Sequence, residues 1–386
     1  MKLDSSIVID VKINGQTATD LGLLIQTAII RTHVLYYVPT VDLILHDLKG
    51  SFDGRQLKDG IEIEVLMSSD ETSGNITPKW ESFLVFKCTP SFNQNYNMYT
   101  ISGYAKDGHK YLFERKTESH AGTSKQVMEK VLAECGIAGW CPLTTDEQSW
   151  WRNHLTAAEF LYQKVLPHAY VDDKSCMLMG YIEGTVYFMN ISEAIQGTPD
   201  WVLANHSHEK MDHYAAEVRI SNESGLMNKT AGYGMTTTED DVVNGTLKKH
   251  SEVDVNKSDR ELNIAEDKRG QQTGAQASTL NIGNSAEEYD RAKHQNTRIM
   301  STYTSFAEVL VRETTKIPLF AVVDLSLQTG GKYDASSSGK YIVIGRARAA
   351  TSKEYVEKIC MVRNAINIED TDRAKYVPDQ GSDANW

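Results

Sequence analysis

The densest group of potential metal ligands lies between positions 206 and 213. It holds three histidines and two carboxylates: His206, His208, Glu209, Asp212 and His213. A His-x-His pair on a strand puts both imidazoles on one side, where a metal ion such as zinc could bind. The last histidine follows His208 by five residues, which is not the H-E-x-x-H spacing of helical metalloproteases. We interpret the group as a solvated loop between domains, with a metal-dependent hydrolase on His206, His208 and His213 as the enzyme alternative.

Two adjacent tryptophans, Trp150 and Trp151, form the next chemically suggestive pair. Neighbouring indole rings could bind a sugar or a base. More often such rings anchor a loop on a core or on a subunit face. A carbohydrate-binding tail protein using this pair is therefore a second alternative.

No other motif indicates catalysis. Gly232 and Gly234 have no third glycine and no following helix, which argues against a phosphate loop. The five cysteines form no C-x-x-C pair that would indicate a zinc ribbon or a redox motif: Cys88, Cys135, Cys141, Cys176 and Cys360. Nucleophile-elbow and kinase motifs are also missing from the sequence. We expect no catalytic, cofactor-binding or metal-binding residue, no cofactor and no enzymatic activity.

Composition narrows the class of protein further. The chain has 386 residues, enough for two or three domains, and a net charge of −12 from 40 basic and 52 acidic residues. An acidic surface repels phosphate backbones, which argues against a general nucleic-acid binder. The N-terminus has no apolar signal region and no window approaches 18 apolar residues. We therefore expect neither a signal peptide nor a membrane span.

The elements that would position any site are mostly strands. Residues 317–327, 340–350 and 355–363 alternate apolar and polar side chains with the period of two that a strand requires. Their connections are polar and rich in glycine, which favours antiparallel turns. A similar block of three strands precedes it at 61–67, 82–88 and 97–105. The repetition predicts two similar β-modules in one chain.

Three further strands are predicted before the first block, at 6–13, 24–34 and 38–47, and Asn14-Gly15 is a strong turn signal. So many antiparallel strands in so short a stretch indicate a barrel or sandwich.

The middle of the chain is predicted to contain helices as well as strands. A helix capped by Thr123 or Ser124 runs to Glu134 and ends at Gly136. A second helix starts in a capping box at Thr156 and ends at Pro167, and a hairpin follows at 176–189.

The remaining chain resumes the strand pattern at 214–221, 226–235 and 301–312. Residues 236–284 are polar and predict a long loop or insertion, followed by a short helix at 286–297. The fold class is thus mainly β with α+β inserts. We expect a first tube-like β-barrel domain at 1–112, an α+β insert domain at 113–212, and a second tube-like barrel domain at 213–235 and 299–368. The polar insertion with its helix covers 236–298 and a C-terminal tail covers 369–386.

This order of modules resembles the tail hub proteins of contractile injection machines: the late control D proteins, the baseplate hub proteins of contractile-tailed phages and the hub part of type VI secretion spike proteins. Residues 156–166 look like the capped helix of the family's insert. Residues 286–297, with Ala292 on the inner side, look like the helix before its second barrel. Residues 339–343, with the strand ending at Arg363, look like its closing hairpin. The long insertion departs from the family, and no lysozyme or needle domain follows, so a puncturing tip is expected on another chain.

The resemblance implies two barrels side by side and a homotrimer whose six barrels match the sixfold tail tube. The ring would bind tail tube or tube-initiator proteins on one side and the trimeric central spike on the other. Baseplate wedge proteins would surround it, and tape measure protein or DNA would pass through its channel without specific binding. Acidic residues such as Glu62 and Glu64 are expected to face the channel or solvent. The implied location is the baseplate of a virion tail, assembled in the host bacterial cytoplasm without a membrane anchor.

Overall fold

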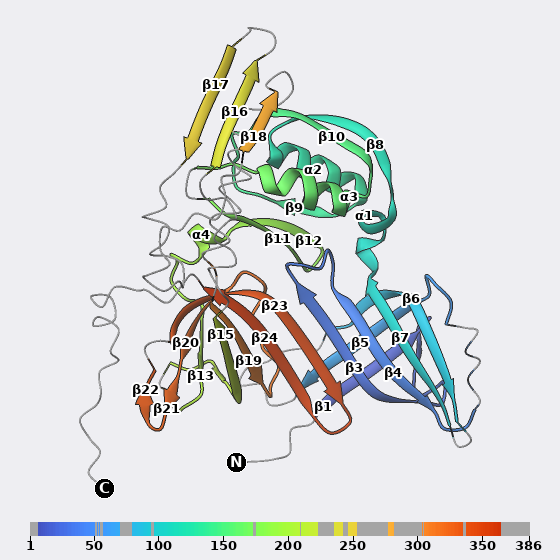
Figure 1. The fold of residues 1–386 in the computed structure, drawn as a ribbon. Coiled ribbons are helices and arrows are strands. Elements are labelled where there is room, and N and C mark those ends of the chain that lie inside the picture. The colour runs from blue at the N-terminus through green and yellow to red at the C-terminus, as the bar shows by residue number, and fades with distance from the viewer. Residues whose placement is uncertain are drawn as a thin grey trace.

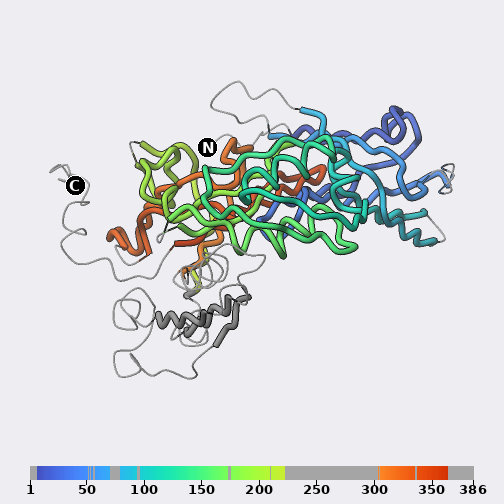
Figure 2. The backbone as a smooth tube through the Cα atoms, turned by 90° about the horizontal axis from the view of Figure 1, so that it is seen from above, coloured from blue at the N-terminus to red at the C-terminus, as the bar shows by residue number. Residues whose placement is uncertain are grey.

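The structure is a computed structural model that describes residues 7–363, with gaps at 51, 53, 55–56, 70–78, 94–95, 173–174, 209, 223–234, 242–245, 253–276, 282–302, 304 and 335–336. The chain is mainly β, and its largest sheet holds 14 strands. Two β-modules lie side by side, with an α+β middle domain above them (Figure 1). Seen from above, the middle domain lies along the line of the two modules (Figure 2). The predicted fold class, mainly β with α+β inserts, is confirmed, and the strands form large antiparallel sheets.

The first module is built from the N-terminal strands. These are β1 (Ile7–Ile13), β2 (Gln16–Thr17), β3 (Leu23–His33), β4 (Thr40–Asp47), β5 (Glu62–Ser69), β6 (Glu81–Phe92) and β7 (Asn97–Ala105). Burial follows the period of two: Val41, Leu43 and Leu45 of β4 are fully buried and alternate with half-buried residues. The turn predicted at Asn14 and Gly15 is present, with positive φ at both residues.

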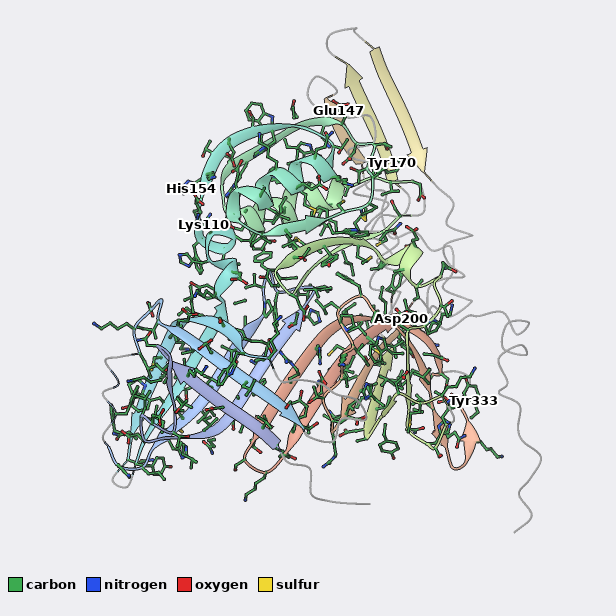
Figure 3. All side chains as sticks on the ribbon, turned by 180° about the vertical axis from the view of Figure 1, so that it is seen from behind. Lys110, Glu147, His154, Tyr170, Asp200 and Tyr333 are labelled. Atoms are coloured by element: carbon green, nitrogen blue, oxygen red, sulfur yellow. The ribbon has the colours of Figure 1, made fainter. Side chains whose placement is uncertain are left out.

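The second module is built from seven strands and a short hairpin. The strands are β13 (Trp201–Ala204), β14 (His213–Tyr214), β15 (Glu217–Asn222), β19 (Ser305–Val311), β20 (Val322–Ser326), β23 (Gly339–Thr351) and β24 (Tyr355–Arg363), and the hairpin is β21 (Gln328–Thr329) with β22 (Lys332–Tyr333). Tyr333 lies at the far tip of this module (Figure 3). β13 pairs with β20, although the sequence had assigned residues 201–204 to the middle domain.

One predicted strand of this module is too long. The sequence predicted a strand over 317–327, but β20 begins only at Val322. Phe320 has φ 63°, a left-handed conformation that ends an extended strand. Its backbone N–H still donates to the Val343 carbonyl, at 2.8 Å. Because Ile317 and Leu319 are buried in the loop before β20, their alternation imitated a strand.

The two modules have the same topology. The sheet order β3-β4-β7-β6-β5 in the first module matches β15-β19-β24-β23-β20 in the second, with the same chain order and antiparallel pairing throughout. An irregularity interrupts both copies at the same place. It falls between Val85 and Lys87 in β6 and between Val343 and Gly345 in β23. A shared bulge makes the two registers equivalent residue by residue.

The register equivalence extends to the cores. Residues at equivalent ladder positions are buried in both modules: Ile63 and Val323, Phe83 and Tyr341, Val85 and Val343, Leu43 and Val309, Ile101 and Ile359. Each set belongs to the core of its own module. The similarity predicted from alternation alone is therefore a true structural repeat.

Neither module closes into a barrel through a continuous ladder of the described strands. In the second module the chain itself links the two edges of the sheet. The N–H of Ala215 donates to Ala204 of β13 at 2.8 Å, and the next N–H, of Ala216, donates to Leu310 of β19 at 2.8 Å. In the first module Ala18 links the two edges. Its N–H donates to the Val11 carbonyl of β1 at 2.7 Å, and its carbonyl accepts from the Leu23 N–H of β3 at 2.8 Å.

The middle domain packs short helices and small sheets around a separate core. Its elements are η2 (Lys106–Gly108), α1 (His109–Phe113), β8 (Lys116–Gly122), α2 (Ser124–Cys135), β9 (Ala138–Trp140), β10 (Gln148–Leu155), α3 (Ala157–Phe160), η3 (Leu161–Val165), η4 (Leu166–His168), β11 (Met177–Ile182), β12 (Thr185–Asn190) and α4 (Ile191–Ala194). Both predicted N-caps are confirmed as capping boxes, at Thr123 and Thr156, and Gly136 ends α2 in the left-handed conformation. The second predicted helix is in fact α3 followed by a π turn and by a 3-10 turn that contains Pro167.

The polar insertion is not a plain loop in its described parts. β16 (Met235–Asp241), β17 (Thr246–Glu252) and β18 (Ala277–Asn281) form a three-stranded sheet. The register sets Glu239 opposite Lys248, and three consecutive threonines follow Met235 in β16. The sequence of these strands is rich in β-branched and charged residues and lacks apolar alternation. The predicted helix at 286–297, the tail at 369–386 and most of the predicted strand at 226–235 lie outside the described residues.

Candidate assembly surface

The junction between the modules is a strand pair formed by distant parts of the chain. Residues 27–33 of β3 pair antiparallel with residues 345–351 of β23. β23 has 13 residues, and its first half pairs with β20 on the same edge. Its other edge pairs with β24. One long strand therefore belongs to the second module and also extends the sheet of the first.

A buried ion pair supports this junction. The Glu357 side chain is fully buried, and its carboxylate accepts hydrogen bonds from Arg346 Nε and, at 2.7 Å, from the Thr315 N–H. A buried carboxylate is costly unless it is paired, so these partners are required. Arg348 follows Arg346 by two residues on β23. It lies 2.7 Å from Glu81 of β6 and links the two modules directly.

Two further contacts hold the modules in one relative orientation. Ser69 and Thr314 exchange backbone-to-hydroxyl hydrogen bonds at 2.8 and 2.9 Å, one in each direction. The tip of the β23–β24 hairpin also enters the other module, because Ala350 and Tyr355 belong to the first module's core. Burial raises the pKa of the Tyr355 hydroxyl, which keeps it neutral there. Strand pairing, ion pairs and core packing thus fix the junction together.

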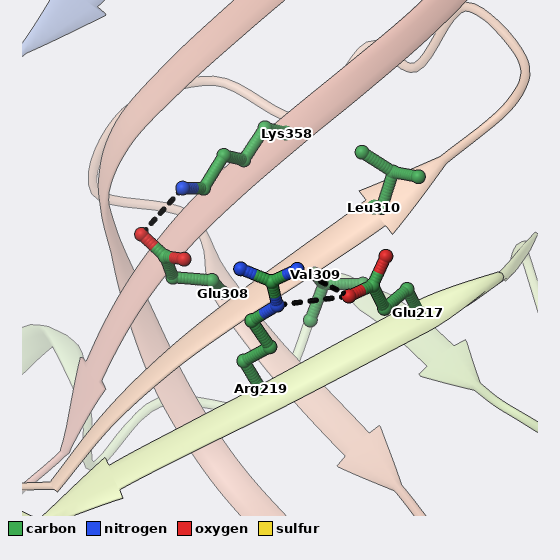
Figure 4. Close-up of a pocket in the computed structure, with 6 residues that line it drawn as sticks. All are labelled: Glu217, Arg219, Glu308, Val309, Leu310 and Lys358. Carbon is green, nitrogen blue, oxygen red and sulfur yellow. Dashed lines mark hydrogen bonds and ion pairs between the residues drawn. The ribbon is translucent and has the colours of Figure 1, made fainter.

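The outer face of the joined sheets carries charges that are paired. On the second module a shallow pocket of about 130 Å³ is lined by Glu217, Arg219, Glu308, Val309, Leu310 and Lys358 (Figure 4). Arg219 lies 2.8 Å from Glu217, and Lys358 lies 2.6 Å from Glu308. On the first module Arg31 pairs with Asp42, which occupies the ladder position equivalent to Glu308.

The acids singled out in the sequence lie on β5 of the first module and are also paired. Glu62 binds Lys106 at 2.7 Å, and Glu64 lies 3.7 Å from Lys12. Both carboxylates are half-buried. Although the whole chain is acidic, the charges of Glu62 and Glu64 are locally neutralised.

The three histidines do not converge. His206 and His208 have ring centroids 5.8 Å apart, but His213 is buried on β14, stacks on Trp201 and lies 2.8 Å from Glu313. Within the described residues no three His, Cys, Asp or Glu side chains form a group that could hold a metal ion. The geometry gives the hydrolase alternative no support.

The two tryptophans point to opposite sides of β10, as neighbours on a strand must. Trp150 is buried, and its indole N–H donates to the Gly122 carbonyl at 2.8 Å. Trp151 is 65% exposed. They cannot form one aromatic platform, so the carbohydrate-binding alternative loses the pair on which it rested.

All five cysteines are free thiols, and burial raises the pKa of Cys141 to about 12.

Sequence reasoning missed the ionic residues of the junction. Their signal was present, because Arg346 and Arg348 alternate within an otherwise small or apolar strand. Their partners, Glu357 and Glu81, could not be assigned without strand register.

Within the described residues, no helix has the length and apolar character needed to cross a membrane.

Comparison with known proteins bears on the fold. No protein-family model matches the chain, and a search of curated proteins also finds no match. Solved structures do match. A tail protein from Neisseria meningitidis MC58 has a TM-score of 0.57 at 10% identity, covering 94% of this chain and 98% of that one. The 43 kDa tail protein of prophage MuSo2 from Shewanella oneidensis has a TM-score of 0.58 at 13% identity, covering 93% and 98%.

A component of the Escherichia coli type VI secretion system, described as similar to two T4 bacteriophage tail proteins, matches with a TM-score of 0.50 at 8% identity. That match covers 91% of this chain and 76% of the other. The identities are low, so the likeness concerns the fold. The similarity to tail hub proteins that the sequence indicated is confirmed at this level: the chain has the fold of phage tail proteins and of this type VI secretion component.

Proposed function

We propose that this chain is a structural protein of a phage tail baseplate or of a related contractile injection machine. The observation that carries the proposal is the repeat: two modules of equal topology and register, joined edge to edge in one chain. The shared fold with tail proteins supports the same assignment. A non-enzymatic role agrees with the dispersed histidines and with the divided tryptophan pair.

In this proposal three copies form a ring that holds six similar modules. A chain with an internal repeat can meet a sixfold partner with six modules and a threefold partner with three subunits. The ring would join the hexameric tail tube, or its initiator proteins, to the trimeric central spike. Wedge proteins of the baseplate would surround it. The fixed junction suits this role, because a flexible angle between modules would prevent regular closure.

We assign the outer sheet face, defined by the paired charges on β15, β19, β24, β3 and β4, to the channel. Arg31, Arg219 and Lys358 each have a carboxylate partner. Cations that are paired with carboxylates give phosphates little to bind, so DNA or tape measure protein would pass without sticking. The proposed location is the virion tail baseplate, with assembly in the cytoplasm of the host bacterium.

Light scattering on the purified full chain tests the proposal most directly. The expected result is a mass of three chains for the protein alone, or of three chains plus the bound spike when the spike protein is added. A chain that stays monomeric at high concentration, with and without the spike, would contradict the ring.

A further inference from the structure

We propose that β15 of one copy pairs antiparallel with the C-terminal half of β6 of the next copy, and that this pairing closes the ring. The inference rests on the proposed function and names the surfaces by which the copies meet. It follows from the repeat, since the chain already contains one example of the contact between its own modules.

The internal junction supplies the template. Within one chain, β3 of the first module pairs with the second half of β23. By topology and register, β15 is the counterpart of β3, and β6 is the counterpart of β23. If each module contacts the next in the same way around the ring, β15 of one copy must meet β6 of another.

The equivalence also fixes the register. Asp42 of β4 and Glu308 of β19 occupy equivalent ladder positions. Ile29 pairs with Asp42 and Arg219 pairs with Glu308, so Arg219 of β15 is the counterpart of Ile29 of β3. On the other strand Ser91 takes the place of Ala349, because each stands at the same distance from its bulge. Since Ile29 pairs with Ala349, we expect Arg219 opposite Ser91. The neighbouring pairs are then Val218 with Phe92 and Ser221 with Thr89.

Both strand edges are available among the described residues. β15 pairs with β19 on one edge only, and residues 87–92 of β6 pair with β7 only. The equivalent edges of β3 and β23 are occupied by each other. The free edges thus occur in the two strands that the repeat selects.

Apolar side chains are left uncovered at these edges. Phe92 is 70% exposed and Val218 is only half-buried. Their counterparts at the junction, Ala350 and Ala28, are fully buried and face each other. The predicted register puts Phe92 opposite Val218, so the contact between copies would cover both.

Pro90 sets a limit on this pairing. At the junction Val34 N–H donates to the Ile344 carbonyl, and alternation along β23 then directs the N–H of Arg348 towards β3. Pro90 stands at the equivalent position of β6 and has no N–H to donate. The contact between copies therefore has one hydrogen bond fewer than the internal junction. A proline on this edge also blocks indiscriminate strand addition before assembly.

A designed disulfide tests the register. Ser221 and Thr89 should form a non-hydrogen-bonded pair, whose Cα atoms lie about 4.5 Å apart, within the range that a disulfide spans. The double variant S221C/T89C should oxidise to covalent dimers and to a closed trimer in a denaturing gel without reductant. The two single variants, which retain the native thiols, and the misregistered pair S221C/S91C should remain monomeric in that gel.

A second variant tests the apolar contact. Because Phe92 is exposed in the single chain, F92D should fold normally. It should raise the protein concentration at which half of the chains are trimeric by at least tenfold. The matched control is L143D in the middle domain, where the leucine is 79% exposed, and it should leave trimer formation unchanged.

The outcomes separate this inference from the proposed function. If light scattering shows a trimer that S221C/T89C does not cross-link, the strand pairing is wrong while the hub proposal stands. If the chain is monomeric at every concentration, with and without the spike protein, both are overturned. Equal cross-linking by S221C/S91C would reject the register, and an F92D trimer as stable as the unmodified one would reject the contact.

Discussion

Glu357 shows how single buried charges define the junction. Its carboxylate has no contact with solvent and depends on Arg346 and on the Thr315 backbone. Such a pair adds little net stability compared with apolar side chains, but removing one partner leaves an uncompensated charge. At this scale the molecule is most sensitive where a charged residue is fully buried beside the strand that joins the modules.

We predict that Glu357→Ala destabilises the second module by about 3–5 kcal/mol, because Arg346 loses its buried partner. Chemical denaturation followed by circular dichroism measures the loss. Glu354→Ala on the same hairpin is the control, since its side chain is exposed and should change stability by less than about 0.5 kcal/mol. Equal effects of the two variants would contradict the role given to the buried pair.

Asp146 provides a pH-dependent prediction. Burial raises the pKa of this carboxyl to about 6, despite hydrogen bonds from Ser124 and Thr144. A raised pKa in the folded state means that the neutral acid stabilises the fold. This contribution is complete below the unfolded pKa of about 3.9 and is lost as pH rises through about 6.

Asp146→Asn removes this titration while keeping an oxygen acceptor for Ser124. Relative to the unmodified protein, we expect the variant to gain on the order of 1–3 kcal/mol between pH 4 and pH 7. Thermal unfolding of both proteins across this range measures the difference, and the exposed Asp107→Asn serves as control. A difference independent of pH would show that the Asp146 carboxyl is already ionised at pH 4.

At the scale of elements, β23 is the strand on which both modules depend. Val343 lies before its bulge and is fully buried in the second core, while Ala350 lies after the bulge and is buried in the first. The bulge changes the alternation between these two stretches, so one strand serves two cores. Val85 is the counterpart of Val343 in β6.

We predict that Val343→Ala costs about 1–3 kcal/mol through the cavity that it leaves. Val343→Asp should prevent folding of the second module and thereby trimer formation, because the carboxylate would have no partner. Limited proteolysis and light scattering measure both effects. His208→Ala should leave assembly and particle function unchanged. Loss of function and of a bound metal in that variant, with normal assembly of Val343→Asp, would favour the hydrolase alternative.

At the scale of the whole molecule, the repeat has its functional meaning in assembly. Two equivalent modules in a fixed orientation define a rotation, and repeating that rotation generates either a closed ring or an open helix. The proposed function requires that it closes after three chains. The same repetition would place the outer sheet face of every module around one channel.

The charge of this face gives a prediction at the same scale. Glu308→Lys removes the carboxylate partner of Lys358. In the proposed ring it also adds a cation at each of the three copies of position 308. We expect trimer and particle assembly to persist, while genome delivery falls by roughly tenfold or more because free cations retain DNA. Infectivity per assembled particle is the measurement. The control is Glu147→Lys, on the exposed surface of the middle domain (Figure 3), which should have no effect.

Much of this fold follows from local sequence. Alternating apolar residues placed β4, β5, β23 and β24 to within one or two residues, and capping residues placed the start of α2, because period and cap act over a few neighbouring positions. The repeat of two β-modules was also visible as a pattern. The threonine-rich sheet β16–β18 was not, because the sequence of its strands has no alternation of apolar residues to detect.

The tertiary structure decided what the local pattern does not contain. The pairing of β3 with β23 joins residues that lie far apart in the sequence, and no periodicity within either strand specifies the other as its partner. The same holds for the ion pair of Glu357 with Arg346, which needs the register of β23 against β24. The sequence by itself determined most strands of the two modules and that two similar sets of strands exist. Which edges meet was decided by packing across the whole chain, because every strand edge presents the same backbone groups except at proline.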